Sequence, residues 1–172
     1  MLVFFVILSM SKRIITGAIT IILLLFAVFW LFWPSEEDRI REQFDELSGL
    51  VSKTEDSSPL SDALILEDFV NLFCEKVTLK TGSRKRLSGG YANHELGQHC
   101  VRLRVSAQTI DLRFENLEFQ EVNLDNAKVT VRVKAFVLDK RGKKHSENFQ
   151  AEVLMRKRDG DWRFACFTYS GP

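Results

Sequence analysis

Four side chains between positions 91 and 111 could together do acid–base chemistry: Tyr91, His94, His99 and Asp111. A histidine exchanges a proton near neutral pH, and a carboxylate at hydrogen-bonding distance would orient it. A tyrosine hydroxyl could hold a developing oxyanion. The set suggests proton transfer on a small molecule, provided that one cavity gathers these groups.

The alternative for these residues is a structural role. Tyr91 and His94 stand at the start of an expected helix, where polar residues more often form a rim or a cap. His99 follows Leu96 by three residues and precedes Leu103 by four, so it would share their helical face and point inward.

Two residues near the C-terminus complete the candidate pocket. Trp162 could stack on a ligand, although a large aromatic beside a hairpin turn is more often part of the core. Thr168 is the one polar residue in the inward register of the last strand. No Ser–His–Asp order, glycine-rich phosphate loop or metal-ligand cluster accompanies them, so we expect no cofactor and no metal.

Cysteine usage is sparse. Cys74, Cys100 and Cys166 are too few for a disulfide framework, and their spacing fits no zinc site. One bridge could form in an oxidising compartment, and at least one thiol is expected to be free and buried.

Three helices are expected before any strand, at 35–51, 59 to about 75, and 93 to about 107. Acidic residues at 36–38 favour the positive N-terminal end of the first helix. Pro59 fits the first position of the second helix, and Asn93 can cap the third. Apolar residues recur at helical spacing in each segment.

The apolar period then changes from 3.6 to 2. The alternation slips by one residue near Leu117 and again near Val122, which predicts bulges in a long, bent strand. Cleanly alternating runs follow at 129–137 and 149–155, and Asp159-Gly160 predicts a tight turn before the last strand. The fold class is α+β, with three helices packed on a curved antiparallel sheet of four or more strands.

The inward positions of these strands contain no acid or base. They are Val129, Val131, Val133, Ala135, Val137, Phe149, Ala151, Val153, Met155, Trp162, Phe164, Cys166 and the polar exception Thr168. Asp111 alternates with apolar neighbours and should face away unless a bulge redirects it. This inventory argues against catalysis.

The outward register holds four large apolar residues that could lie side by side: Phe136, Leu154, Phe167 and Tyr169. A contiguous apolar patch usually marks a contact surface, which predicts a twofold homodimer. Separate half-exposed aromatics, covered by basic side chains, are the alternative.

Ile14–Trp33 is a run of twenty residues without a charge. A helix of that length, at about 1.5 Å per residue, matches a hydrocarbon core about 30 Å thick. Since Lys12 and Arg13 precede the run, we expect the N-terminus in the cytoplasm. The expected organisation is a cytoplasmic segment at 1–13, a transmembrane helix at 14–33 and an extracytoplasmic domain at 34–172.

Two alternatives concern this N-terminal region. A cleaved signal peptide also has a basic start and an apolar centre, but this run is long and aromatic residues occupy the place of the small cleavage residues. Met10 is an alternative start, because the apolar stretch before it is too short to span a membrane.

Charge gives no case for nucleic-acid binding. Residues 34–172 contain all 23 acidic residues and 22 of the 24 basic residues, a formal charge of −1. Basic runs at 84–86, 140–144 and 156–158 fit solvated loop tips. Contact with anionic lipid headgroups is the alternative for these runs.

The order of elements and the closing Arg158-Asp159-Gly160-Asp161-Trp162-Arg163-Phe164 resemble the nuclear transport factor 2-like superfamily over roughly residues 36–170. That resemblance implies a cone-shaped α+β domain. Members include ketosteroid isomerases, polyketide cyclases, dehydratases, dimerisation modules and periplasmic scaffolds of type IV secretion machines, so the fold does not choose a function.

We expect a non-catalytic binding or assembly module, anchored in a bacterial cytoplasmic membrane with its domain outside. Its expected partners are the bilayer through Ile14–Trp33, a second copy of the chain, and an unidentified protein. The alternative is a membrane-tethered small-molecule-binding protein or enzyme of the ketosteroid isomerase or polyketide cyclase type. An open apolar cavity with an inward His99–Asp111 pair would favour the enzyme, whereas a cone filled by Phe and Trp side chains would favour the interaction module.

Overall fold

The computed structural model describes residues 21, 24, 34–55, 59–81 and 88–171. Contacts divide the chain into two compact units, Met1–Ser35 and Glu36–Pro172. Among the described residues, no helix is both long enough and apolar enough to cross a membrane. The span expected at 14–33 falls outside them, apart from Ile21 and Leu24.

The second unit is an α+β domain built on one six-stranded sheet, in the order β2-β1-β6-β5-β4-β3. The strands are β1 (Phe73–Lys80), β2 (Gly89–Ala92), β3 (Ala107–Val122), β4 (Asn126–Asp139), β5 (Lys144–Arg158) and β6 (Asp161–Gly171). The sheet is mixed, because β1 runs parallel to β6 while the other pairs are antiparallel. The expected purely antiparallel sheet is therefore corrected to a mixed one of six strands.

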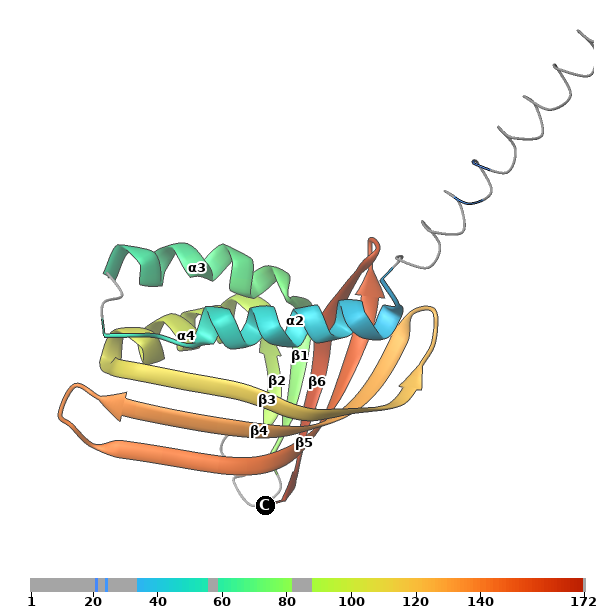
Figure 1. The fold of residues 1–172 in the computed structure, drawn as a ribbon. Coiled ribbons are helices and arrows are strands. Elements are labelled where there is room, and N and C mark those ends of the chain that lie inside the picture. Colours follow the sequence, from blue (N-terminus) through green and yellow to red (C-terminus); the bar gives the residue numbers. More distant parts are fainter. Residues whose placement is uncertain (1–20, 22–23, 25–33, 56–58, 82–87, 172) are drawn as a thin grey trace, which may run out of the picture. The chain divides into compact units, whose positions relative to one another are not determined.

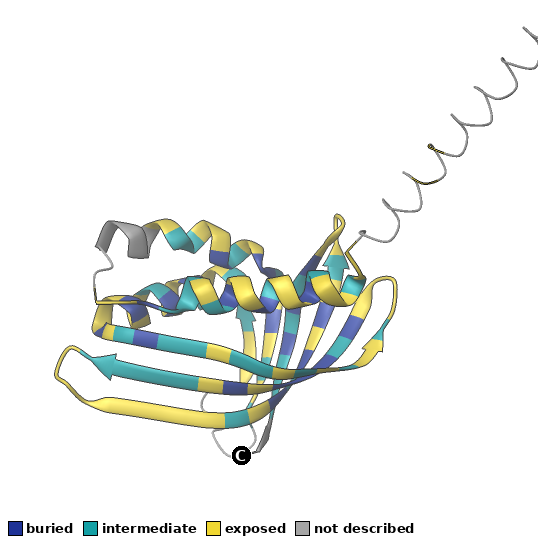
Figure 2. Cartoon of the chain, viewed as in Figure 1, coloured by how far each residue is buried: buried dark blue, intermediate teal, exposed yellow. Residues whose placement is uncertain are grey.

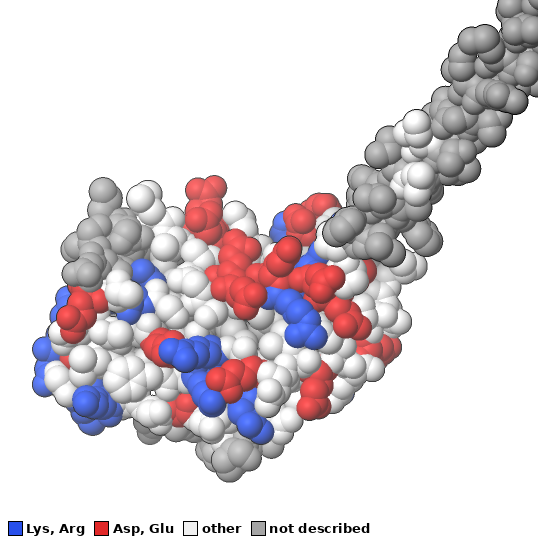
Figure 3. Space-filling view, in the orientation of Figure 1, with Lys and Arg blue, Asp and Glu red and all other residues white. Residues whose placement is uncertain are grey.

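Three helices lie along the concave side of this curved sheet (Figure 1). They are α2 (Glu36–Val51), α3 (Pro59–Asn71) and α4 (Asn93–Ser106). The three expected helices are confirmed, with the second one shorter than predicted. The apolar face of α2 buries Ile40, Phe44 and Leu47, while its acidic residues cover the solvent side (Figure 3).

The second helix was expected to reach about residue 75, which includes the first residues of strand β1. Phe73 and Val77 are four residues apart, which fits one helical turn, but the same spacing fits two steps along a strand. The structure uses the strand pattern: Phe73 and Val77 are buried and Leu79 is half-buried. Strand β2 has only four residues, Gly-Gly-Tyr-Ala, which carry no apolar period. These are the two strands that the sequence interpretation did not identify.

The bulges expected in β3 are confirmed. Its pairing with β4 shifts between Glu115 and Glu118 and again between Phe119 and Glu121. Asn116 takes a left-handed backbone conformation, with φ of 53°, within the first shift. Bulges increase local twist, so the long strand bends around the helices. The Asp159-Gly160 turn is also confirmed, since both residues have positive φ.

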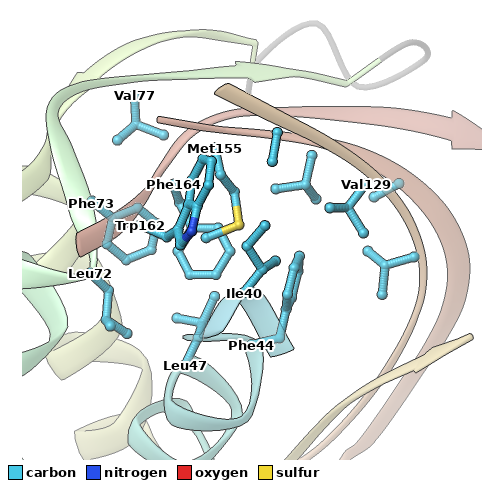
Figure 4. Close-up of a cluster of buried hydrophobic side chains, with 14 of the residues drawn as sticks. Ile40, Phe44, Leu47, Leu72, Phe73, Val77, Val129, Met155, Trp162 and Phe164 are labelled. Carbon is cyan, nitrogen blue, oxygen red and sulfur yellow. The ribbon is translucent and has the colours of Figure 1, made fainter. Parts of the chain in front are cut away.

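The core occupies one end of the concave space (Figures 2 and 4). The rings of Phe44 and Phe164 meet edge to face with centroids 5.0 Å apart, and both side chains are almost fully buried. Trp162, Met155 and Val129 of β4 belong to the same cluster of buried side chains. The first half of α2 thus fills the end of the sheet next to the β5–β6 hairpin.

Candidate functional site: an open cavity on the concave face

The other end of the concave space is a cavity of ≈ 780 Å³. Ligand-binding pockets usually enclose about 300–1,000 Å³. The cavity is lined by Leu47, Val51, Phe69, Phe73, Leu79, Lys80, Thr81, Leu96, His99, Cys100, Leu103, Leu112, Phe114, Val133, Ser146, Glu147, Asn148, Phe149, Phe167 and Tyr169. Most of these side chains are apolar, and five are phenylalanines.

Helices and sheet contribute opposite walls. The last turns of α2 supply Leu47 and Val51, and one face of α4 supplies Leu96 and Cys100. The sheet supplies a continuous row across three strands, because Phe114 lies opposite Val133 and Val133 opposite Phe149. Since paired residues on neighbouring strands share a face, this row forms an apolar floor.

The end of α2 is held by a buried arginine of α4. Arg104 donates from its guanidinium to the carbonyl oxygens of Leu50, Val51 and Ser52, at 2.9, 3.2 and 2.5 Å. These are carbonyls that a helix end leaves without an intrahelical partner. Lys53, also buried, donates to the Arg104 carbonyl at 2.8 Å. The α2 terminus that borders the cavity is therefore fixed to α4.

A register shift in β6 brings two further aromatics into the cavity. The pairing with β5 shifts between Leu154 and Met155, so that Cys166 lies opposite Leu154 while Phe167 lies opposite Val153. Val153 is fully buried on the concave side, so Phe167 and Tyr169 face the same way and line the cavity. The expected outward placement of Phe167 and Tyr169 is wrong because that bulge reverses the alternation.

The same bulge moves Cys166 and Thr168 to the convex face. Cys166 and Thr168 are paired with Leu154 and Glu152, and their Sγ and Oγ1 atoms are 3.8 Å apart. Neither residue lines the cavity. The expected inward register for these two positions is therefore wrong. All three cysteines are free thiols.

Of the six candidate pocket residues, only His99 lines the cavity, where its side chain is exposed. Tyr91 lies on β2 opposite Val77 and is half-buried. His94 is exposed at the start of α4. Trp162 is a core residue whose Nε1 donates to Glu36.

Asp111 does not meet His99. It lies opposite Phe136 in the β3–β4 register and forms an ion pair with Arg113, with 2.8 Å between nitrogen and oxygen. The neighbouring pair, Leu112 and Ala135, faces the cavity side, so Asp111 faces the convex side. The hypothesis of an inward His99–Asp111 pair is therefore wrong.

Glu147 is a carboxylate at the cavity that the sequence interpretation missed. It lines the cavity from β5, opposite Ala135, and its side chain is exposed. The alternation that makes Phe149 inward also makes residue 147 inward, two positions earlier. Extending the register by one step would have found this carboxylate.

The polar side chains that line the cavity are more exposed than most of the apolar ones. His99 and Glu147 are exposed at the wall, whereas the interior is formed by half-buried or buried apolar side chains. Among the described residues, no cluster of His, Cys, Asp or Glu could hold a metal ion. The arrangement is suited to enclosing an apolar body beside a polar rim.

No family model matches the sequence, and no curated protein matches it either. Solved structures do match the fold. One is a proposed aromatic ring hydroxylase from Novosphingobium aromaticivorans, 13% identical, with a TM-score of 0.62 over 81% of this chain and 92% of that one.

A proposed scytalone dehydratase from the same organism is 15% identical, with a TM-score of 0.62 over 80% of this chain and 84% of the other. A protein from Caulobacter vibrioides with a cystatin-like fold is 12% identical, with a TM-score of 0.54 over 79% and 90%. The fold is thus cystatin-like α+β, as the resemblance to the nuclear transport factor 2-like superfamily implies. At these identities the likeness concerns the fold alone.

Proposed function

We propose that the domain is a non-catalytic receptor or carrier for a small, mainly apolar molecule bound in the concave cavity. The observation that carries this proposal is the ≈ 780 Å³ cavity itself, walled by aromatic and aliphatic side chains and bordered by His99 and Glu147. A core-filling role for this space would leave no such volume, since protein interiors are close-packed. The similar folds named as a hydroxylase and a dehydratase are consistent with small-molecule binding.

Catalysis is not part of the proposal. The enzymes of the resembled superfamily need an acid or base and an oxyanion donor aimed at the substrate inside the cone. Asp111 lies on the convex side here, and Trp162 donates its N–H to Glu36. His99 and Glu147 are exposed. We therefore keep the expectation of a non-catalytic protein from the sequence analysis. In place of an assembly module, we propose the small-molecule-binding protein that was its alternative.

The membrane anchor is part of the proposal. Ile14–Trp33 is uncharged over a length that can cross a bilayer, and basic residues precede it. The domain would then act at the outer face of a cytoplasmic membrane. An alkaline phosphatase fused after residue 172 should be active in cells, whereas a fusion active only in the cytosol would contradict this placement.

Ligand binding can be tested with a matched pair of substitutions. Leu103 is 41% exposed at the cavity, and Leu154 is 39% exposed on the convex face. Leu103→Trp should narrow the cavity and weaken binding of 1-anilinonaphthalene-8-sulfonate, measured by fluorescence titration, by about tenfold. Leu154→Trp should leave it unchanged. Equal effects of the two substitutions, or no saturable binding by the unaltered protein, would contradict the proposal.

A further inference from the structure

The convex face near the β5–β6 hairpin holds an unusual like-charge pair. Arg156 of β5 and Arg163 of β6 lie directly opposite each other. Their neighbours Met155, Trp162 and Phe164 are buried on the concave side, so both arginines face the convex side. Like charges directly opposite on neighbouring strands repel each other, which lowers sheet stability unless something neutralises them.

A third arginine lies at the same place. Arg158 is the next outward residue of β5, and Asp161 is opposite it at the hairpin. Burial raises the pKa of the half-buried Cys74 thiol, and the positive charges of Arg156, Arg158 and Arg163 oppose that rise. The Cys74 Sγ atom lies 4.0 Å from the Arg163 carbonyl oxygen, which places this thiol of β1 beside the group of arginines.

The protein does not neutralise this group of charges. Among the described residues, none of the three arginines forms an ion pair or a side-chain hydrogen bond. The Nε atom of Arg163 is buried and has no hydrogen-bond partner. A buried guanidinium N–H without an acceptor is rare, because its desolvation is then uncompensated.

Elsewhere on the same face, two lysines do have partners. Lys128 pairs with Glu152 and Lys134 with Glu115, each with 2.8 Å between nitrogen and oxygen. The strand register places those pairs on the convex side as well. The arginine cluster lacks such partners and, unlike the exposed Arg132 of the same face, contains a buried guanidinium N–H without an acceptor.

We propose that Arg156 and Arg163, flanked by Arg158, form a binding site for a phosphate-type dianion on the convex face. Guanidinium groups present planar pairs of N–H donors that match phosphate oxygens, and two of them directly opposite can hold one group from two sides. The anion would remove the repulsion between the paired arginines and accept from their guanidinium N–H groups. This site is on the opposite face of the sheet from the cavity and does not depend on its ligand.

The test uses the full-length protein in an uncharged detergent, with inorganic phosphate as the probe. Phosphate should raise the Tm in a concentration-dependent way, beyond the effect of chloride at equal ionic strength, because it binds the folded state. Arg156→Gln should weaken the apparent affinity about tenfold or more. Arg163→Lys, which keeps the charge but loses the fork, should weaken it less and guards against a folding defect.

Arg132→Gln is the matched control. Arg132 is an exposed arginine of β4 on the same face, with Glu115 opposite it. The Arg132→Gln variant should bind phosphate with the same apparent affinity as the unaltered protein. Equal losses in Arg132→Gln and Arg156→Gln, or a phosphate effect no larger than that of chloride, would overturn the site. A change in mass by light scattering for Arg156→Gln, without phosphate binding, would instead assign the charges to a second copy and also overturn it.

A second experiment distinguishes a lipid headgroup from a free phosphate ester as the natural source of the anion. Dihexanoyl phosphatidic acid and dihexanoyl phosphatidylcholine, both soluble, are compared with inorganic phosphate. Tighter binding of the phosphatidic acid would identify a lipid headgroup, and equal binding would identify a free phosphate ester. Because the cavity probe is measured separately, loss of this site and loss of cavity binding are distinguishable.

Discussion

Trp162 and Glu36 join the two ends of the domain: the indole Nε1 donates to the Glu36 carboxylate at 2.7 Å, across 126 positions of sequence. Lys157 donates to both oxygens of the same carboxylate at 2.8 Å. Glu36 is the first residue of α2, where a negative charge also favours the helix dipole. One carboxylate therefore connects the start of the first helix with the closing hairpin.

This contact gives the stability of the domain a defined pH dependence. The pKa of Glu36 is lowered, chiefly by the hydrogen bond from Lys157, with burial opposing and Trp162 adding to the shift. A carboxyl group with a lower pKa in the folded state stabilises the fold above its unfolded pKa of about 4.3, and that stability is lost as pH falls through the folded pKa. Glu36→Gln should therefore lower stability at neutral pH and reduce the loss in acid.

The expected loss of stability in Glu36→Gln is modest, because the Glu36 side chain is 40% exposed and solvent screens its interaction with Lys157. We expect about 1 kcal/mol or less from urea unfolding at neutral pH. Glu37→Gln, on the same helical turn but fully on the solvent side, is the control and should change little. An acid dependence that is identical in Glu36→Gln and the unaltered protein would contradict the assignment.

Arg104 should be one of the most sensitive polar positions. Arg104→Ala leaves the carbonyls of Leu50, Val51 and Ser52 without their donor in a partly buried place. We expect a loss of roughly 2–3 kcal/mol in the free energy of urea unfolding. Arg102→Ala, an exposed position on the same helix, should cost less than about 0.5 kcal/mol. Similar losses at the two positions would mean that the cap does not hold α2.

A close contact between α3 and α4 predicts a sharp difference between two glycines. A Cβ atom at Gly97 of α4 would lie 2.5 Å from Leu66 Cδ1 and 3.0 Å from Val70 Cγ2 of α3. Gly97→Ala must push the helices apart or force off-rotamer side chains, which should cost about 1–3 kcal/mol. At Gly49 of α2 no atom lies within 4 Å, so Gly49→Ala should be stabilising by up to about 1 kcal/mol. Thermal unfolding of the two variants should therefore shift in opposite directions.

Sequence patterns predicted the elements whose signals are local. The apolar face of α2, the phase slips in β3 and the Asp159-Gly160 turn each depend on residues a few positions apart. Strand β1 was missed because much of its evidence is non-local: besides its antiparallel pairing with β2, it pairs in parallel with β6, nearly ninety positions later. The apolar residues of β1 fit both the helical period of 3.6 and the strand period of 2.

The candidate site was less predictable for a related reason. One unpaired residue in β6 reverses the face of everything that follows, so Phe167 and Tyr169 exchange sides with Cys166 and Thr168. A regular alternation gives no sign of a single-residue bulge. Glu147, in contrast, follows the alternation of its strand, so its inward position could have been predicted from the sequence.

The placement of Phe167 changes what its removal should do. The sequence-based hypothesis put Phe167 on a dimer face with Phe136, Leu154 and Tyr169, so its substitution would give monomers. In the structure its ring lies 5.4 Å from Phe164 and 6.3 Å from Phe73, inside the domain. Phe167→Ser should therefore lower the free energy of unfolding by about 3 kcal/mol and weaken probe binding, with no change in oligomeric state.

The remaining residues of the predicted dimer face supply the control. Phe136 and Leu154 both lie on the convex side, but far apart. Leu154 of β5 is paired with Lys128 of β4, and Lys128 and Phe136 are eight residues apart, or about 26 Å at about 3.3 Å per residue. Charged pairs such as Lys128–Glu152 lie on this face. Homodimerisation thus stays a prediction that depends on Leu154 and Phe136. If the protein is a dimer through this face, Leu154→Lys should lower its mass by light scattering, whereas Phe167→Ser should not. The reverse result would mean that Phe167 lies on the convex side and does not line the cavity.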